Sequence, residues 1–196
     1  MNQKARQSNI NNMIKPFIED MPEMEMISVT ADTLDERMDY LIDEIESGMQ
    51  DKDIQYLTSK VLHEYNVGNR DWYGQAEAVF NWVRENIMYV RDPAGIEQFR
   101  KPIRTVQQAM GDCDDMSILI CAMLSSIGHI MILRVIGVES NEPEHIYPLD
   151  LIPPVDLQNA KAIALDATRA EPMGWQVNEN QMKFLQDYEL DFESDE

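Results

Sequence analysis

Apolar side chains recur every three or four positions over four stretches of the chain, which is the spacing of amphipathic α-helices. The first stretch begins at Thr33, where Thr33 and Glu36 form a capping-box pattern, and its apolar face ends near Gly48. The fourth stretch is the most apolar and is followed by Gly128, a common helix end. The pattern therefore predicts helices over residues 33–49, 53–65, 74–87 and 113–127.

The periodicity changes after Gly128 to runs rich in β-branched residues. Pro148 lies inside the second of these runs and cannot donate a hydrogen bond to a sheet, so that strand is expected at an edge or with a bulge. Helices first and strands later predict an α+β domain in which a small antiparallel sheet packs on one long helix. The strands are predicted over residues 130–138, 145–152 and 160–168.

The domain organisation follows from composition. Residues 1–30 are polar and then Met-rich without a clear period, which predicts a flexible arm or one that orders against a partner. Residues 31–180 carry the predicted helices and strands and form one domain. Residues 184–196 contain six acids and no base, which predicts an acidic tail.

The charge excludes two classes of partner. The 196 residues contain 36 acids and 16 Lys or Arg, a formal net charge of −20. A surface of this sign repels phosphate backbones and anionic membranes, so neither nucleic acid nor a membrane is an expected partner. The excess lies in the flanks, because residues 54–183 hold only 17 acids and 11 bases.

Both cysteines fall in the fourth predicted helix. Cys113 and Cys121 are eight residues apart, about 12 Å along a helix axis, which is too far for a disulfide within the chain. The first residues have no apolar stretch typical of a secretory signal, and no run approaches the length of a membrane span. We therefore expect synthesis in a reducing, cytoplasmic compartment.

Cys113 is the candidate nucleophile. Gly111 permits a tight turn, Asp112 is a good helix N-cap, and Cys113 would lie in the first helical turn, where the helix dipole favours a thiolate. The alternative is that Cys113 is one more small buried residue, although three flanking acids argue against deep burial and also oppose thiolate formation. Cys121 lies among apolar neighbours and is expected in the core.

A nucleophilic cysteine needs a base and a group that orients the base. His145 begins the second predicted strand and Asp166 lies in the third, so antiparallel pairing would place them side by side. His63 lies in mid-helix and is interpreted as structural. His129 follows the far end of the Cys113 helix, about 20 Å from the sulfur, which is too far for proton transfer.

Three ordered motifs resemble the transglutaminase-like superfamily. Residues 111–116 (Gly-Asp-Cys-Asp-Asp-Met) resemble its nucleophile helix, residues 145–147 (His-Ile-Tyr) its histidine strand, and residues 165–168 (Leu-Asp-Ala-Thr) its aspartate strand. Residues 82–93 are similar to the segment that precedes this core, and the whole match covers about residues 70–176. Compact members of this kind resemble those encoded by tailed bacteriophages.

The resemblance implies a papain-like fold and thiol acyl chemistry on a protein or peptide substrate. It assigns Cys113, His145 and Asp166 as the triad, the Cys113 N–H as one oxyanion donor and Gln107 as a candidate for another. It implies no cofactor, although related proteins bind calcium beside the nucleophile, so Asp112, Asp114 and Asp115 are candidate ligands; capping of the helix explains the same acids. The alternative function is a virion structural or assembly protein that keeps this fold and binds neighbouring virion proteins.

Overall fold

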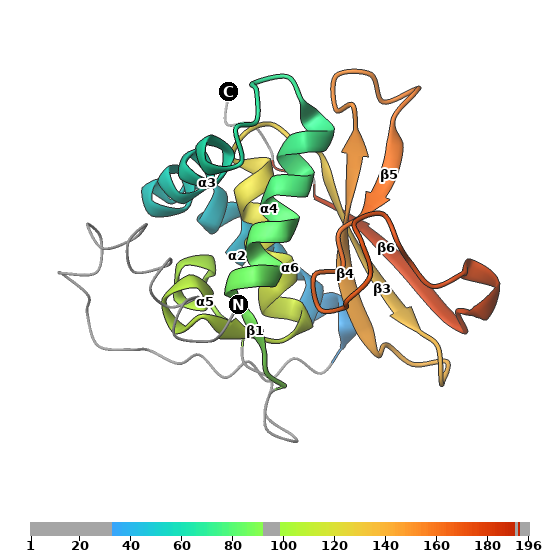
Figure 1. Ribbon diagram of the computed structural model, residues 1–196. Coiled ribbons are helices and arrows are strands. Elements are labelled where there is room, and N and C mark those ends of the chain that lie inside the picture. Colours follow the sequence, from blue (N-terminus) through green and yellow to red (C-terminus); the bar gives the residue numbers. More distant parts are fainter. Residues whose placement is uncertain (1–32, 92–98, 191, 193–196) are drawn as a thin grey trace.

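The computed structural model describes residues 33–91, 99–190 and 192 (Figure 1). Its helices form one layer and a four-stranded antiparallel sheet forms the other, which is the predicted α+β architecture. The predicted arm over residues 1–30 lies outside the described residues. No helix in the described part of the chain is long and apolar enough to cross a membrane.

The four predicted helices are confirmed with shifts of a few residues at their ends. The capping box at Thr33 is present, with the Thr33 side chain accepting from the Glu36 N–H and the Glu36 carboxylate accepting from the Thr33 N–H. A short fifth helix precedes the helix that begins at Cys113, and a 3-10 turn covers Glu179–Gln181. The α-helices are α2 (Leu34–Gln50), α3 (Lys52–Glu64), α4 (Trp72–Asn86), α5 (Pro102–Gln108) and α6 (Cys113–Ser125).

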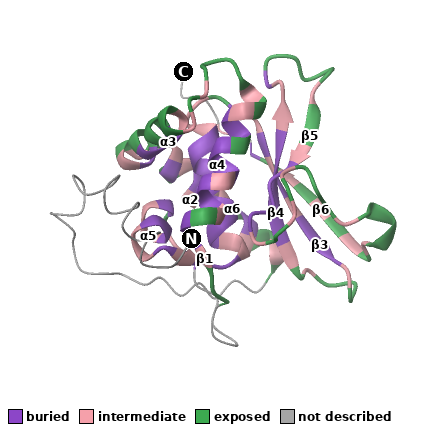
Figure 2. Cartoon of the chain, in the orientation of Figure 1, coloured by how far each residue is buried: buried purple, intermediate pink, exposed green. Residues whose placement is uncertain are grey.

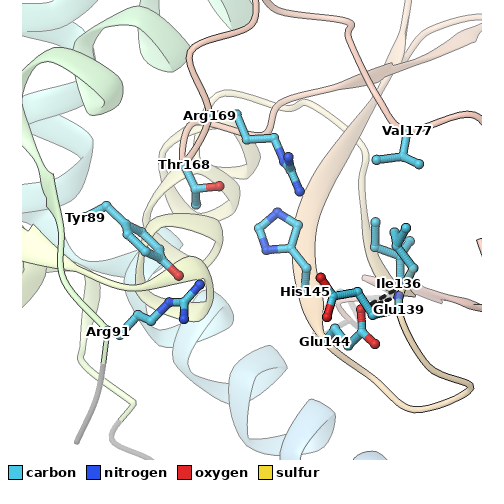
Figure 3. A pocket seen from close by; sticks show the side chains of 10 residues that line it. Tyr89, Arg91, Ile136, Glu139, Glu144, His145, Thr168, Arg169 and Val177 are labelled. Atoms are coloured by element: carbon cyan, nitrogen blue, oxygen red, sulfur yellow. Dashed lines mark hydrogen bonds between the residues drawn. The ribbon is translucent and has the colours of Figure 1, made fainter.

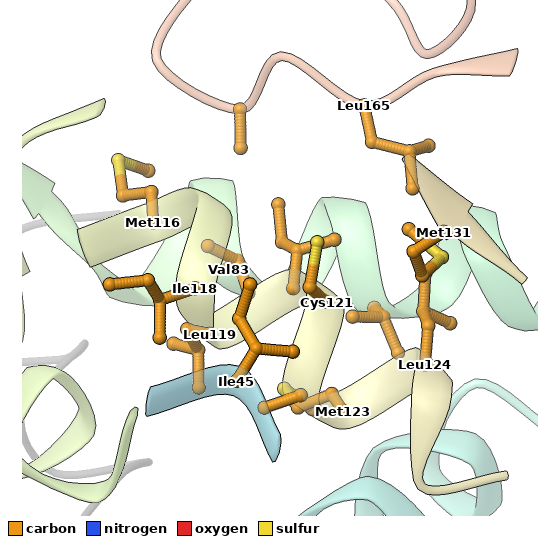
Figure 4. Close-up of a cluster of buried hydrophobic side chains, with 14 of the residues drawn as sticks. Ile45, Val83, Met116, Ile118, Leu119, Cys121, Met123, Leu124, Met131 and Leu165 are labelled. Carbon is orange, nitrogen blue, oxygen red and sulfur yellow. The ribbon is translucent and has the colours of Figure 1, made fainter. Parts of the chain in front are cut away.

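Helix α6 is the centre of the molecule. Every residue from Asp115 to Leu124 is buried, because α2, α3, α4 and α5 surround the helix on one side and the sheet covers the other (Figures 1 and 2). An all-round apolar helix of this kind belongs inside a protein. Cys121 lies in this core, as predicted, among the side chains in Figure 4. The core therefore fixes the position of α6, and with it the position of Cys113.

The sheet has the order β5–β4–β3–β6, with β3 (Met131–Gly137), β4 (His145–Ile152), β5 (Lys161–Ala164) and β6 (Phe184–Glu189). Strand β4 is interior and its register with β3 is continuous from Met131↔Asp150 to Ile136↔His145, so the expectation of an edge or bulge at Pro148 is wrong. Pro148 has no N–H to donate. Its carbonyl accepts from the N–H of Leu165, just beyond β5, so the missing donor falls where the pairing of β4 with β5 ends.

Strand β6 occupies residues that the sequence analysis assigns to the acidic tail. It pairs antiparallel with β3 in the register Arg134↔Asp187, and the Arg134 guanidinium binds both carboxylate oxygens of Asp187 at 2.8 and 2.7 Å. This pair uses one of the acids that give the segment its tail-like composition. The outer face of the sheet carries a second, smaller apolar cluster that includes Ile136 and Tyr147.

A two-stranded parallel pair lies beside the turn that precedes Cys113. Strand β1 (Met88–Tyr89) pairs with β2 (Met110–Gly111) in the register Tyr89↔Gly111. Because β2 ends just before Asp112, this pairing brings Tyr89 next to the start of α6. Neither strand is predicted from the sequence, since two residues are too few to show a period.

Candidate active site

Cys113 is the first residue of α6, as predicted. The Asp112 side chain caps the helix by accepting from the N–H groups of Asp114 and Asp115 at 3.1 and 3.2 Å. Gly111 is needed here for close approach, because a Cβ at this position would lie 2.6 Å from the Asp115 Cβ. The local sequence therefore builds the helix start and sets Cys113 at the end of the helix that faces the sheet.

The Cys113 sulfur lies against the part of β4 that is not paired with β5. Pairing between β4 and β5 covers Leu149–Ile152, and one further bond joins the Leu165 N–H to the Pro148 carbonyl. The pairing ends before Ile146, whose backbone groups face α6 instead. The Ile146 N–H points to the Cys113 sulfur, and the Ile146 carbonyl accepts from the Ser117 hydroxyl at 3.4 Å. Cys113 is thus held beside the residue that follows His145.

The pKa of the Cys113 thiol is raised well above its ordinary value, contrary to the expectation of a helix-stabilised thiolate. Burial is the largest cause, and the charges of Asp114 and Asp112 add to it. The Asp114 carboxylate accepts from the sulfur at 3.8 Å. Desolvation and two nearby carboxylates therefore outweigh the helix dipole, and the resting cysteine is a neutral thiol.

The three acids around Cys113 have separate roles. Burial, together with the charge of Asp112, raises the pKa of Asp114 and of Asp115 to about 7. The fully buried Asp115 accepts from the Asp112 N–H and from the Arg100 N–H and guanidinium, which ties the residues before α5 to α6. Among the described residues, no three His, Cys, Asp or Glu side chains are arranged to hold a metal ion. Asp112 and Asp115 take part in capping and Asp115 also binds Arg100, whereas the Asp114 side chain contacts the Cys113 sulfur.

His145 and Asp166 lie together. The imidazole Nε2 is 2.8 Å from the Asp166 Oδ2, and both side chains are mostly buried. The other carboxylate oxygen accepts from the Thr168 hydroxyl at 2.6 Å, and the Arg169 Nε is 3.1 Å from Oδ2. Burial pushes the pKa of Asp166 up, but the hydrogen bonds from His145 and Thr168 and the charge of Arg169 hold it below its ordinary value. Asp166 is therefore an ionised acceptor for the histidine.

His145 opens onto a pocket of about 590 Å³ (Figure 3). Tyr89 and Arg91 form one side, Ile136, Val138 and Val177 form an apolar side, and Glu139, Glu144, Thr168 and Arg169 complete the lining. Burial raises the pKa of Tyr89 and the nearby Cys113 adds to this rise, so Tyr89 is a lining residue that also lies close to Cys113. Among the lining residues, only His145 was assigned a role from the sequence. The others come from five separate segments, and no local pattern relates them.

Gln107, the candidate oxyanion donor, lies near the end of α5. Its side-chain oxygen accepts from the Arg104 guanidinium at 3.2 Å, and it does not line the pocket. The structure therefore leaves the role of Gln107 as an expectation from sequence spacing, whereas the Cys113 N–H stands at the open start of α6.

His129 takes part in a second histidine–aspartate pair, which is not predicted from the sequence. Its Nδ1 is 2.7 Å from the Asp150 Oδ2, its Nε2 is 3.1 Å from the Gln75 side-chain oxygen, and the pair is fully buried. The sequence did hold a signal: Asp150 is an isolated acid in an apolar strand and needs a buried partner. His129 thus joins the end of α6 to β4 and α4, away from Cys113.

Similarity to known proteins identifies the family to which this chain belongs. No curated protein matches the chain. A solved structure from Cytophaga hutchinsonii, described as a "Putative Cysteine Protease", is similar with 16% sequence identity and a TM-score of 0.45. The alignment covers 75% of this chain and 46% of that one, so this chain spans less than half of that protein. The profile of the "Transglutaminase-like superfamily" matches residues 59–168, more than half of the sequence, and the chain belongs to that superfamily.

Proposed function

We propose that the protein is a thiol-dependent acyl hydrolase or peptidase in which Cys113 is the nucleophile, His145 the base and Asp166 the residue that orients the base. The observation that carries this proposal is the His145–Asp166 hydrogen bond at a pocket, next to the strand edge that holds Cys113. Membership of the transglutaminase-like superfamily supports the same chemistry.

The hydrogen bond to Asp166 determines the tautomer of His145. An ionised Asp166 only accepts, so Nε2 carries the hydrogen and the lone pair is on Nδ1. Among the described residues, nothing hydrogen-bonds to Nδ1. That nitrogen is therefore available to take a proton from the Cys113 thiol.

The reaction then proceeds in two stages. The Cys113 sulfur attacks the substrate carbonyl carbon while His145 takes the thiol proton, and the Cys113 N–H stabilises the resulting oxyanion. His145 returns the proton to the leaving amine as the carbon–nitrogen bond breaks, which leaves a thioester on Cys113. Water attacks the thioester while His145 takes its proton. The carbon–sulfur bond then breaks to release the acid, and His145 returns that proton to the Cys113 sulfur. Because the raised pKa keeps Cys113 neutral at rest, the proton moves during attack and not before it.

The substrate is proposed to be a protein or peptide. The competing proposal is a structural or assembly protein, such as a phage virion component, that retains the fold without the chemistry. It predicts that Cys113 reacts only as an ordinary, partly buried thiol. The two proposals therefore differ in whether His145 accelerates acylation of Cys113.

The test is acylation by p-nitrophenyl acetate, a small uncharged ester. Native protein should release p-nitrophenol at least about 100-fold faster than His145→Ala, since general-base catalysis contributes about that much. Intact mass should show the acetyl group on Cys113, with Cys113→Ala as the blank and buried Cys121 as an internal control. Equal rates for native protein and His145→Ala, with both variants folded, would reject the hydrolase and favour the structural role.

A further inference from the structure

Two arginines in the pocket have N–H groups that the proposed acyl chemistry does not use: Arg91 has no part in it, and Arg169 contributes only through Nε, which helps to keep Asp166 ionised. Arg91 follows β1, and Arg169 follows Asp166 after a gap of two residues. Figure 3 shows them on different sides of His145, with Arg91 beside the Tyr89 hydroxyl and Arg169 next to the imidazole. Two guanidinium groups around one histidine are notable in a chain where acids outnumber bases by 36 to 16.

Neither of the two glutamates of the pocket forms an ion pair with Arg91 or Arg169 among the described residues. Glu144 accepts from the backbone N–H groups of Val138, Glu139 and Ser140 at 2.6–3.0 Å and from the Ser140 hydroxyl at 2.8 Å. Its oxygens are used by the turn between β3 and β4. Glu139 is on the same side as Glu144, across His145 from Arg91 (Figure 3).

Arg134 differs from the pocket arginines because all three nitrogens of its guanidinium group donate hydrogen bonds. Arg134 bonds both oxygens of Asp187 as well as Glu179 and Gln176. Arg169 uses only Nε, toward Asp166, and its guanidinium lies 5.5 Å from the Trp175 ring.

The pocket arginines keep donors available. Within the described part of the chain, the Nη groups of Arg169 form no hydrogen bond, and Arg91 hydrogen-bonds to Tyr89 but forms no ion pair. Guanidinium groups with open donors in a pocket match a carboxylate, which they can bind through two parallel hydrogen bonds.

We propose that Arg91 and Arg169 form the walls of a subsite for an acidic side chain of the substrate, an inference that rests on the proposed thiol hydrolase function. The apolar wall of Ile136, Val138 and Val177 suits an apolar residue next to that acid. The pocket volume of about 590 Å³ is of the size that holds such ligands. The substrate class is therefore a peptide in which Asp or Glu adjoins an aliphatic residue.

The experiment measures binding to the full-length Cys113→Ala protein, so that no chemistry intervenes. Three peptides, acetyl-Leu-Xaa-Leu-amide with Xaa as Glu, Gln or Lys, are titrated by calorimetry. The Glu peptide should bind about tenfold more tightly than the Gln peptide, and the Lys peptide should bind most weakly. The preference for Glu should shrink as salt is added.

Variants assign the preference to the two arginines. In the same background, Arg91→Gln and Arg169→Gln should each bring the Glu-to-Gln affinity ratio toward one. Lys161→Gln removes an equal charge from the exposed start of β5, at the far end of β4 from His145, and should leave the ratio unchanged.

The subsite is wrong if the Glu and Gln peptides bind equally, if none binds, or if the double Arg91→Gln, Arg169→Gln variant keeps the preference. These outcomes are separate from the ester test, which uses an uncharged substrate. Loss of ester acylation with a retained Glu preference would reject the hydrolase while the subsite stands, and the reverse result would reject the subsite alone.

Discussion

Two histidine–aspartate pairs in this protein have the same sequence separation and different surroundings. His145–Asp166 and His129–Asp150 both span 21 residues, and their hydrogen bonds are 2.8 and 2.7 Å long. The histidine of the first pair lines a pocket, and its Nδ1 has no partner in the described residues, whereas the second pair is fully buried and both ring nitrogens of its histidine are bonded. The difference teaches that an orienting carboxylate is not enough to make a histidine a candidate base, because the second ring nitrogen must also be open.

The amide of Gln75 fixes the protonation of the buried pair. Its nitrogen donates to the Gly68 carbonyl at 3.0 Å, so its oxygen faces His129 and Nε2 must carry a hydrogen. The short contact between Nδ1 and Asp150 then requires one more proton between these two groups. The pair is therefore a neutral unit that joins α6, α4 and β4, and removing one member leaves the other unpaired.

The largest expected effect is on stability. His129→Ala would leave Asp150 and Gln75 without their partner in the core, so the free energy of unfolding should fall by about 3–5 kcal/mol. His145→Ala should cost about 1 kcal/mol or less, because Asp166 keeps Thr168 and Arg169 and the site is open to water. Urea unfolding of both variants measures the difference. Equal losses would show that the two pairs do not differ in the way their burial indicates.

The second prediction concerns activity, for which the larger effect is expected at the pocket pair and not at the buried pair. Asp166→Asn should slow acylation of Cys113 by roughly 10²- to 10⁴-fold, since an amide no longer fixes the His145 tautomer or stabilises the imidazolium. Asp150→Asn is the matched control at the buried pair. It should destabilise the protein while folded molecules keep a native acylation rate with p-nitrophenyl acetate. A native rate in Asp166→Asn would remove Asp166 from the mechanism.

The sequence predicts the pocket pair but not the buried pair, for a physical reason. His145 and Asp166 lie in motifs with recognisable neighbours, and antiparallel pairing brings neighbouring strands together. His129 and Asp150 meet through packing of a helix end on a strand, which leaves no periodic trace. A single acid between Leu149 and Leu151 was the only local sign.

In strand β6 the acidic composition obscures the alternation of half-buried and exposed side chains that is typical of a strand. Phe184, Gln186 and Tyr188 are half-buried and alternate with exposed side chains, which is a strand pattern. The acids among the exposed positions made the segment resemble a tail. One of them, Asp187, is paired across the sheet with Arg134, and that partner lies 53 residues away in the sequence. Charge counts cannot show such pairing.

A smaller effect is expected from pH at the pocket pair. The folded pKa of Asp166 is lowered, so its ionised form contributes stability above the unfolded value, near 4, and the contribution is lost as pH falls through the folded pKa. Native protein should therefore exceed Asp166→Asn in unfolding free energy at pH 6, and the gap should close in acid. Urea unfolding at a series of pH values between 6 and 2 measures the gap. A gap that widens in acid would contradict the direction of the shift.

The smallest effect is expected at Glu144, which precedes His145. Hydrogen bonds from the backbone of Glu139 and Val138 and from Ser140 lower the pKa of Glu144 to about 2. The side chain is exposed, so Glu144→Gln should lower Tm by no more than about 4 °C at pH 6. Because the folded pKa lies below the unfolded one, the difference in Tm should shrink as pH falls from 4.5 toward 2.

Glu142→Gln is the matched control for Glu144→Gln, because Glu142 is an exposed acid in the same turn and its side chain accepts no hydrogen bond among the described residues. It should leave Tm unchanged across the same pH range, as followed by thermal unfolding. Equal shifts in the two variants would mean that the loss of charge acts alone. A shift confined to Glu144→Gln would show that the turn at the mouth of the pocket is held by this carboxylate, which keeps the β3–β4 turn beside His145 in place before any substrate binds.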